Sequence, residues 1–174
     1  SMFLWSSLPD QELMGLATSG KLNETGVLLS QTERMLVDPR AKRFSRHFVR
    51  QWLGLQLLDY LQVDRKVFGG FNDELKHAMQ REPVAFFNEV LRENHSVMDF
   101  IHSDYTMINE RLAQHYRIPN IYGSHFRKVA MNPVDQRGGL LTQAGLLAMN
   151  SDGKDSHPLK RGIWLLENIL HDPP

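Results

Sequence analysis

The stretch Arg137–Leu170, RGGLLTQAGLLAMNSDGKDSHPLKRGIWLLENIL, decides the fold prediction. Apolar residues dominate its two ends, whereas the middle part, Asn150–His157, contains only polar residues and one glycine. This pattern predicts two buried helices joined by a tight polar loop. The pair Gly138-Gly139 permits a sharp entry of the chain into the first of these helices. A polar loop carried by buried helices is where we expect a functional site to lie.

The composition is that of a globular protein and excludes several classes of function. The 174 residues include 20 basic and 20 acidic side chains, so the formal net charge is zero. We expect no nucleic-acid partner, because neutralising phosphates normally requires a basic excess. The sequence has no cysteine, which excludes disulfides, zinc–thiolate sites and covalent haem attachment within it. No apolar run reaches the roughly 18 residues of a membrane-spanning helix.

Helix start and stop signals predict four helices in the first half of the chain. The residues that begin them are, in order, Pro9-Asp10, Asn23, Pro39 and Asn72. The third helix, residues 39–55, has the clearest amphipathic pattern, with Phe44, Phe48 and Trp52 on one face. The fourth continues through Pro83, and we expect a kink near residues 79–82. Residues 57–71 lack periodicity and are predicted to form a loop packed down by Tyr60, Leu61, Val67 and Phe68.

The region before the opening stretch is predicted to contain a short helix over 95–101, one further helix and one strand. Residues 103–106 should form a turn that caps a helix over 107–116, which Ile118-Pro119 then ends. The alternating residues 126–131 predict a strand, paired with an extended piece near Leu140. The predicted fold is therefore all-α (mainly α): a compact bundle-like domain with at most a short two-stranded β element. Its helices around Trp52, Phe86 and Trp164 should share one core.

Two groups of polar residues are the candidate binding or loop-anchoring sites: Asn109, Glu110 and Arg111, and then Ser151, Asp152, Asp155, His157, Lys160 and Arg161. The first group could fix neighbouring loops through hydrogen bonds. In the second, hydroxyls beside a helix start usually act as caps, and catalytic triads normally converge from separate segments, so anchoring is favoured over catalysis. Two cations in the first turn of a helix oppose its dipole. We therefore expect Lys160 and Arg161 to hold the loop acids or an external anion.

Metal binding is not favoured by the histidine spacing. No H-E-x-x-H motif is present, and the Asp152 and Asp155 pair lacks the calcium-binding pattern of an EF-hand. His95, His102 and Asp104 come together around one predicted turn, but capping or surface roles explain them better. We predict no metal and no other cofactor in this chain.

Motifs along the whole chain resemble a known family. They are FLWSSLPD (3–10), QWLGL (51–55), DYTMINERLAQHY (104–116), RGGLLTQ (137–143), HPLKRG (157–162) and WLLEN (164–168). Together they resemble planctomycete-type domains of unknown function found in large cytochrome-associated proteins. The resemblance implies two adjoining family domains: a helical domain over 1–120, and a C-terminal helical segment over 121–174 packed on the first as one unit. The family usually has Gly at the position of Arg117, and an uninterrupted helix where this chain has Pro83.

The resemblance implies a module of a large exported multidomain protein, in the periplasm or at the cell surface, with haem c on a neighbouring domain. The apolar start SMFLWSS and the end DPP are also expected of a piece from a longer chain. The family has no established enzymatic activity, so we expect a non-catalytic scaffold or interaction module. Its partners would be neighbouring domains of the same polypeptide, a polysaccharide or a protein. The alternatives are a hydrolase or redox-coupled enzyme domain acting on an extracellular polymer, and a domain holding non-covalent haem.

Overall fold

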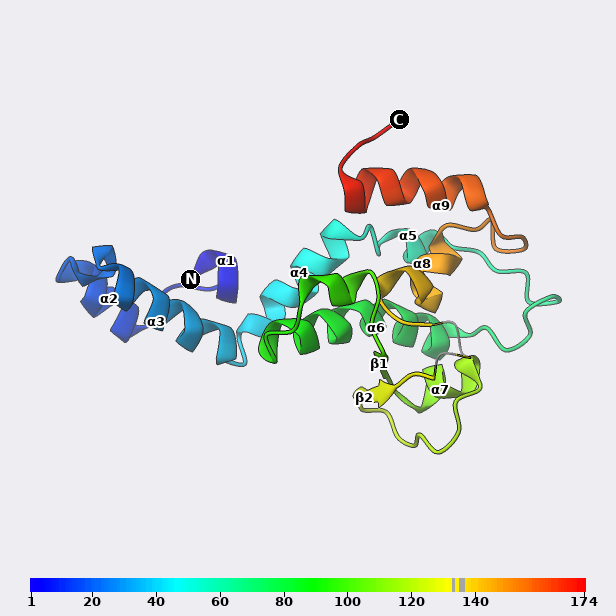
Figure 1. The fold of residues 1–174 in the computed structure, drawn as a ribbon, viewed down its shortest axis with the longest axis horizontal. Helices are drawn as coiled ribbons and strands as arrows, with labels where there is room; N and C mark the ends of the chain where they lie inside the picture. The colour runs from blue at the N-terminus through cyan, green and yellow to red at the C-terminus, as the bar shows by residue number, and fades with distance from the viewer. Residues whose placement is uncertain (133, 135–136) are drawn as a thin grey trace. The chain divides into compact units, whose positions relative to one another are not determined.

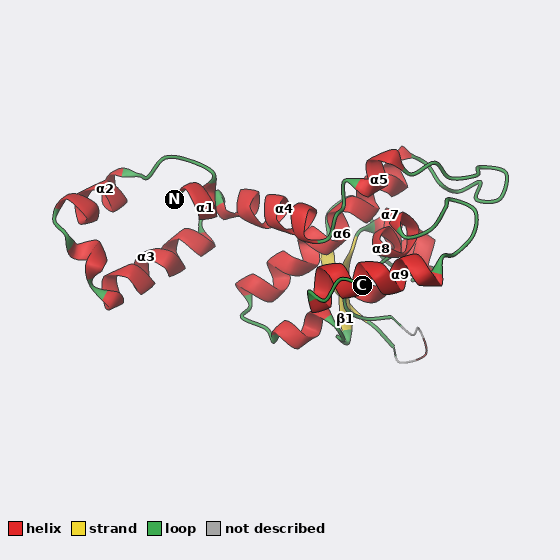
Figure 2. Ribbon diagram, turned by 90° about the horizontal axis from the view of Figure 1, so that it is seen from above, coloured by secondary structure: helices red, strands yellow, loops and turns green. Residues whose placement is uncertain are grey.

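The computed structural model describes residues 1–132, 134 and 137–174, and helices dominate it (Figures 1 and 2). The α-helices are α1 (Met2–Trp5), α2 (Gln11–Thr18), α3 (Thr25–Val37), α4 (Ala41–Trp52), α5 (Leu57–Tyr60), α6 (Asp73–Arg92), α7 (Glu110–Tyr116), α8 (Ala144–Met149) and α9 (Pro158–Leu165). The strands β1 (Tyr105–Ile108) and β2 (Arg127–Ala130) form one antiparallel pair. Short 3-10 turns cover Lys21–Asn23, Val97–Phe100 and Leu140–Thr142, and a π-helical turn covers Leu166–Leu170. The predicted mainly α-helical fold with a short two-stranded β element is confirmed.

The chain divides into two compact units, Ser1–Phe48 and Val49–Pro174. The first unit is built around Trp5, whose side chain is fully buried with Leu13, Met35 and Ala41. The indole N–H of Trp5 donates to the carbonyl oxygen of Met35 at 2.9 Å. Asp10 caps α2 by accepting from the backbone N–H of Leu13 at 3.0 Å, as its position in the sequence predicts. Buried aromatic and capping contacts thus organise this unit locally.

The second unit is organised by α6, which contacts β1, α7 and α8. Asn72 caps this helix by accepting from the N–H of Leu75 at 2.9 Å, as predicted. Aromatic rings extend the core around the helix: Phe86 stacks on Tyr105 with ring centroids 5.1 Å apart, and Phe100 lies 5.6 Å from Trp52. Trp164 of α9 is also buried and donates to the carbonyl oxygen of Leu53 at 3.1 Å. The helices around Trp52, Phe86 and Trp164 therefore share a core.

A buried carboxylate ties α6 to its neighbours. Glu82 is 1% exposed and accepts hydrogen bonds from the Tyr116 hydroxyl at 2.6 Å and the Thr106 hydroxyl at 3.3 Å. The Tyr116 oxygen in turn accepts from the backbone N–H of Ala144, the first residue of α8, at 2.8 Å. Burial raises the pKa of Glu82 to about 7, although the hydrogen bonds from Tyr116 and Thr106 and the charge of Arg137 oppose this rise.

Helix α6 runs continuously through Pro83. Proline has no N–H, so the Met79 carbonyl, four residues earlier, loses its usual helical partner. Helix α8 approaches this same carbonyl, because a Cβ added at Gly145 would lie 2.7 Å from the Met79 oxygen. Glycine at position 145 therefore permits the close packing of α8 on α6. The predicted kink near residues 79–82 stays a prediction.

The opening stretch folds largely as its pattern predicts, with α8 and α9 on either side of the polar loop 150–157. Gly138 and Gly139 both have positive φ angles, of 146° and 72°. A Cβ at Gly138 would lie 2.0 Å from the Ser103 oxygen, and one at Gly139 would lie 2.6 Å from the Ile101 oxygen. The pair therefore gives the chain its sharp entry and its close approach to the segment before β1.

Two predictions for the region 103–131 are wrong. Residues 105–108 form β1 rather than the start of a helix, and α7 begins only at Glu110, capped by Asn109. The strand β2 is confirmed, but it pairs with β1, in register Tyr105↔Ala130, and not with a segment near Leu140. The partner of β1 lies more than a helix away in sequence, so local capping signals at Ser103 could not reveal it.

Smaller predictions also fail. Asn23 does not cap α3, whose N-terminal flanking residue is Glu24. Phe48 is 39% exposed rather than buried on α4. In the segment 57–71, α5 forms where a loop is predicted, and Tyr60, Val67 and Phe68 are 80%, 54% and 46% exposed. Within the described part of the chain, no helix is long and apolar enough to cross a membrane.

Candidate functional site

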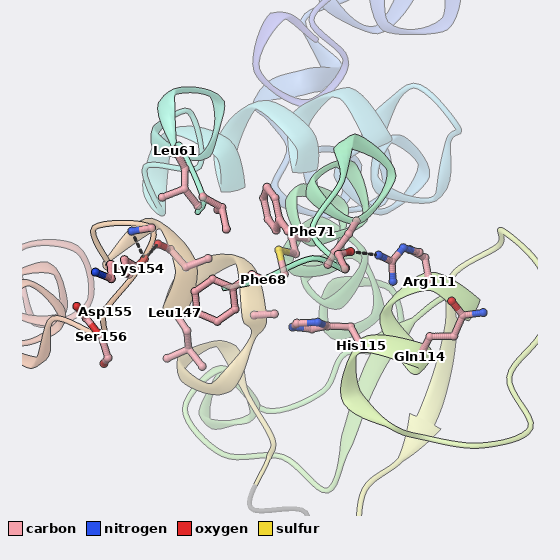
Figure 3. A pocket seen from close by; sticks show the side chains of 18 of the residues that line it. Leu61, Phe68, Phe71, Arg111, Gln114, His115, Leu147, Lys154, Asp155 and Ser156 are labelled. Atoms are coloured by element: carbon pink, nitrogen blue, oxygen red, sulfur yellow. Dashed lines mark hydrogen bonds between the residues drawn. The ribbon is translucent and has the colours of Figure 1, made fainter. Parts of the chain in front are cut away.

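A cavity of about 640 Å³ lies in the second unit, bounded by the segment after α5, by α6, α7 and α8, and by the loop between α8 and α9 (Figure 3). Its apolar lining residues are Leu61, Val63, Phe68, Phe71, Leu75, Met79, Ala144, Leu147 and Ala148. Its polar and charged lining residues are Arg111, Gln114, His115, Arg137, Ser151, Lys154, Asp155, Ser156 and Arg161. This volume and mixed lining are typical of small-molecule sites.

Helix α7 supplies one wall of the cavity. Asn109 begins this helix by accepting from the N–H of Leu112 at 3.1 Å. Arg111 then donates to the carbonyl oxygen of Gly70 at 2.5 Å, and so holds the segment before α6 against α7. His115 lies one helical turn after Arg111, and Figure 3 shows its ring pointing toward the middle of the cavity. The predicted loop-fixing role of Arg111 stays a prediction.

Glu110 fixes a different loop. Its carboxylate accepts from the N–H of Gly123 at 2.7 Å, and its own N–H donates to the Gly123 carbonyl at 3.0 Å. Glu110 and Asn109 therefore shape α7 and the connection to β2, and neither lines the cavity. Of the first predicted group, Arg111 alone reaches the site.

The loop 150–157 forms the opposite wall. Asp152 accepts from the backbone N–H groups of Lys154 at 2.9 Å and Asp155 at 2.6 Å, and these bonds hold its pKa below the usual range. Gly153 has a φ of 85°, and a Cβ there would lie 1.8 Å from the Gln62 oxygen. The loop is therefore packed directly on the segment that follows α5, so that two separate parts of the chain make one wall.

The cations of the last helix do not hold the loop acids. Arg161 donates to the hydroxyl of Ser156, and Asp152 instead has His157 beside it, with 3.8 Å between His157 Nε2 and Asp152 Oδ2. Lys160 is exposed and, like Asp152 and His157, is not among the cavity-lining residues. The second predicted group therefore contributes Ser151, Asp155 and Arg161 to the cavity.

His115 and Arg137 are cavity residues that the sequence interpretation missed. Arg137 donates to the Thr142 carbonyl at 3.0 Å and lies over the Tyr116 ring at 4.1 Å. Partial burial lowers the pKa of His115, and the nearby charges of Arg137 and Arg111 lower it further. The signal for His115 was present, because it lies four residues after Arg111 on one predicted helix and so shares its face.

The geometry of the hydroxyl groups favours binding over nucleophilic catalysis. Ser151 donates to the Ala148 carbonyl at 2.7 Å and accepts from the Gly153 N–H at 3.1 Å, so its oxygen is used to end α8 and shape the loop. Ser156 accepts from Arg161. A nucleophilic serine would instead donate to a neighbouring base.

The histidines show no metal-binding arrangement in the residues that the structure describes, which hold no group of three or more side chains able to bind a metal ion. His95, considered above with His102 and Asp104, packs its ring on Tyr105 with centroids 5.5 Å apart. Its Nε2 atom lies 3.0 Å from the Lys128 ammonium. These contacts give His95 a structural role beside β1.

Comparisons with known proteins match two families and place them end to end. Residues 1–118 match the family model of PSD4, described as a protein of unknown function (DUF1592). Residues 137–174 match PSCyt3, described as a protein of unknown function (DUF1588). Neither the curated proteins nor the solved structures gave a match. The predicted division at residue 120 stays a prediction. Since the first match covers more than half of the sequence, the chain belongs to the PSD4 family of unknown function, and a PSCyt3 domain adjoins it.

Proposed function

We propose that this chain is a non-catalytic binding module in which the two family regions together form one ligand cavity. The proposal rests on which of the two family regions supplies each residue that lines the cavity. The cavity-lining residues between 61 and 115 belong to the PSD4 match, and those between 137 and 161 belong to the PSCyt3 match. Neither region alone encloses this space, which gives a physical reason for the two families to occur side by side.

The fixed loops of the site support a binding role. Arg111 holds the segment before α6 through Gly70, and Gly153 packs the α8–α9 loop on Gln62. A preformed cavity binds a ligand without the entropic cost of ordering loops. The serine hydroxyls are used within the loop, so the site offers shape and charge in preference to a nucleophile.

The proposal extends to the protein that contains this module. We place it in an exported, planctomycete-type multidomain protein of the periplasm or cell surface, with haem c on a neighbouring domain. The cytochrome-associated name of the PSCyt3 family supports this placement. The partners would be those neighbouring domains and a polysaccharide or protein outside the chain.

The proposed non-catalytic role is tested by a search for turnover. The chain would be incubated with chromogenic esters, glycosides and soluble polysaccharides, beside the variants Ser151→Ala and His115→Ala. We expect no turnover that either variant removes. Hydrolysis by the unsubstituted chain that is lost in Ser151→Ala or His115→Ala, with unchanged circular dichroism, would establish an enzyme instead.

A further inference from the structure

We propose that the cavity takes a small organic anion, with an apolar aromatic or aliphatic body and one anionic head group. This inference rests on the proposed binding function and names the class of ligand. It comes from two separate features of the lining: its apolar residues, and the cations Arg111, Lys154 and Arg161, of which, among the described residues, only Arg111 has a carboxylate in ion-pair range.

The apolar lining residues provide the surface for an apolar body. Phe68 and Leu147 lie in the middle of Figure 3, with Lys154 on one side and Arg111 on the other. Phe68 lines the cavity and is 46% exposed, so part of its ring is open to solvent there. A ligand body on Phe68 and Leu147 would remove this apolar surface from water.

Arg111, Lys154 and Arg161 provide the positive charge that would bind the anionic head group of the ligand. Arg111 and Arg161 are positioned by neutral oxygens, those of the Gly70 carbonyl and the Ser156 hydroxyl. Within the described residues, the one carboxylate in ion-pair range of Arg111, Lys154 or Arg161 is Glu74, 4.0 Å from the Arg111 Nε atom. Asp155 is the single carboxylate that lines the cavity.

Other arginines of the chain differ from those of the cavity because they form close ion pairs with aspartates. Arg34 lies 2.8 Å from Asp10, Arg40 lies 2.7 Å from Asp38, and Arg50 lies 2.5 Å from Asp59. Those charges are neutralised within the protein, whereas, among the described residues, Lys154 and Arg161 have no carboxylate in ion-pair range and Arg111 has only Glu74 at 4.0 Å. Guanidinium groups in a partly dehydrated site bind carboxylates, sulfonates and phosphates through short, charge-assisted hydrogen bonds.

The test compares two fluorescent probes that share one apolar body. The first is 1-anilinonaphthalene-8-sulfonate, and the second is its uncharged parent, N-phenyl-1-naphthylamine. Both would be titrated into the full chain at low salt, with fluorescence as the readout. We expect saturable binding of the sulfonate at one site, about tenfold tighter than the uncharged parent, because one charge-assisted hydrogen bond contributes about that factor.

Three variants locate the binding. Arg161→Gln should weaken sulfonate binding about tenfold and leave the parent unchanged, whereas Arg92→Gln, on the exposed end of α6, should change neither. Ala148→Phe should fill the cavity and abolish binding of both probes. Circular dichroism would verify that each variant folds, and Lys154→Gln, a residue with an exposed side chain, provides a second charge variant.

The outcomes separate this inference from the proposed function. Equal affinities for the two probes, with no effect of Arg161→Gln or Lys154→Gln, would overturn anion selectivity and leave a cavity that binds apolar molecules. Sulfonate binding that persists in Ala148→Phe, or no binding at all, would overturn the inference as well. The proposed non-catalytic role is overturned only by the turnover assay.

Discussion

Replacing the buried Glu82 by glutamine should change the pH dependence of stability. Glu82 lies between Tyr116 and Thr106, and burial raises its pKa from an ordinary 4.5 to about 7. Glutamine has the same shape. Its carbonyl oxygen can accept from Tyr116 and its amide can donate to the Thr106 oxygen, so both hydrogen bonds can be kept.

The size and sign of this change in the free energy of unfolding follow from proton linkage. Between pH 4.5 and 7 the folded protein holds a proton on Glu82 that the unfolded chain has released, so Glu82 stabilises the fold less as the pH rises through this window. At about 1.4 kcal/mol per pH unit, the loss from pH 4 to pH 8 is about 3 kcal/mol. The full contribution is present below the unfolded pKa of 4.5 and is gone above the folded pKa of about 7.

The assay is urea unfolding of the unsubstituted chain and Glu82→Gln at pH 4, 6 and 8, followed by circular dichroism. The free energy of unfolding of the variant, relative to the unsubstituted chain, should rise by about 3 kcal/mol from pH 4 to pH 8. Glu93→Gln, at the exposed end of the same helix, is the matched control and should show no such rise. A relative stability of Glu82→Gln that is constant or falls with pH would refute the reasoning.

Three further substitutions test contacts and backbone strain in the second unit by the same urea assay at pH 7. Tyr116→Phe should destabilise by about 1–3 kcal/mol, because the N–H of Ala144 loses its acceptor and Glu82 loses a donor; an unchanged stability would contradict this. Gly145→Ala should cost about 1–3 kcal/mol, since the added Cβ would lie 2.7 Å from the Met79 oxygen; a neutral effect would show that α8 can move away from α6. Arg117→Gly should stabilise by up to about 1 kcal/mol, because Arg117 has a left-handed φ of 60° that glycine adopts without strain; a loss of stability would mean that the Arg117 side chain matters more than its backbone.

The helices with strong local signals could be predicted from the sequence. Asp10 and Asn72 each begin a helix as predicted, because a cap bonds to a residue only three positions later. The strand β1 could not be predicted in this way. Its four residues are all buried between α6 and the paired strand β2, and neither neighbour is visible in a local window.

Arg117 stands where the family usually has glycine, and the structure shows which backbone conformation this position adopts. The sequence resemblance places glycine at this position in the family, and the structure ends α7 there with a left-handed residue. Glycine is the residue that most easily adopts this conformation at a helix end. Arginine adopts the same left-handed conformation here at a cost in backbone strain.

The sequence predicts one of the two walls of the candidate site. The polar loop 150–157 stands out between two apolar helices, and it does form a wall of the cavity. The other wall depends on the packing of α7 beside α8, which brings His115 and Arg111 opposite Lys154 (Figure 3). Local spacing does not reveal the partners within the loop, because Arg161 bonds to the nearer Ser156 hydroxyl, while Asp152 accepts from backbone N–H groups.

The most direct test of an anion-binding cavity is the pKa of His115, measured by NMR titration of its ring in the two probe complexes. In the free protein, partial burial and the charges of Arg137 and Arg111 lower this pKa. Either probe would bury the ring further, but only the sulfonate brings a negative charge that favours the protonated imidazole. The account predicts a higher His115 pKa in the complex with 1-anilinonaphthalene-8-sulfonate than in the complex with N-phenyl-1-naphthylamine. Equal values, or a lower value with the sulfonate, would contradict it.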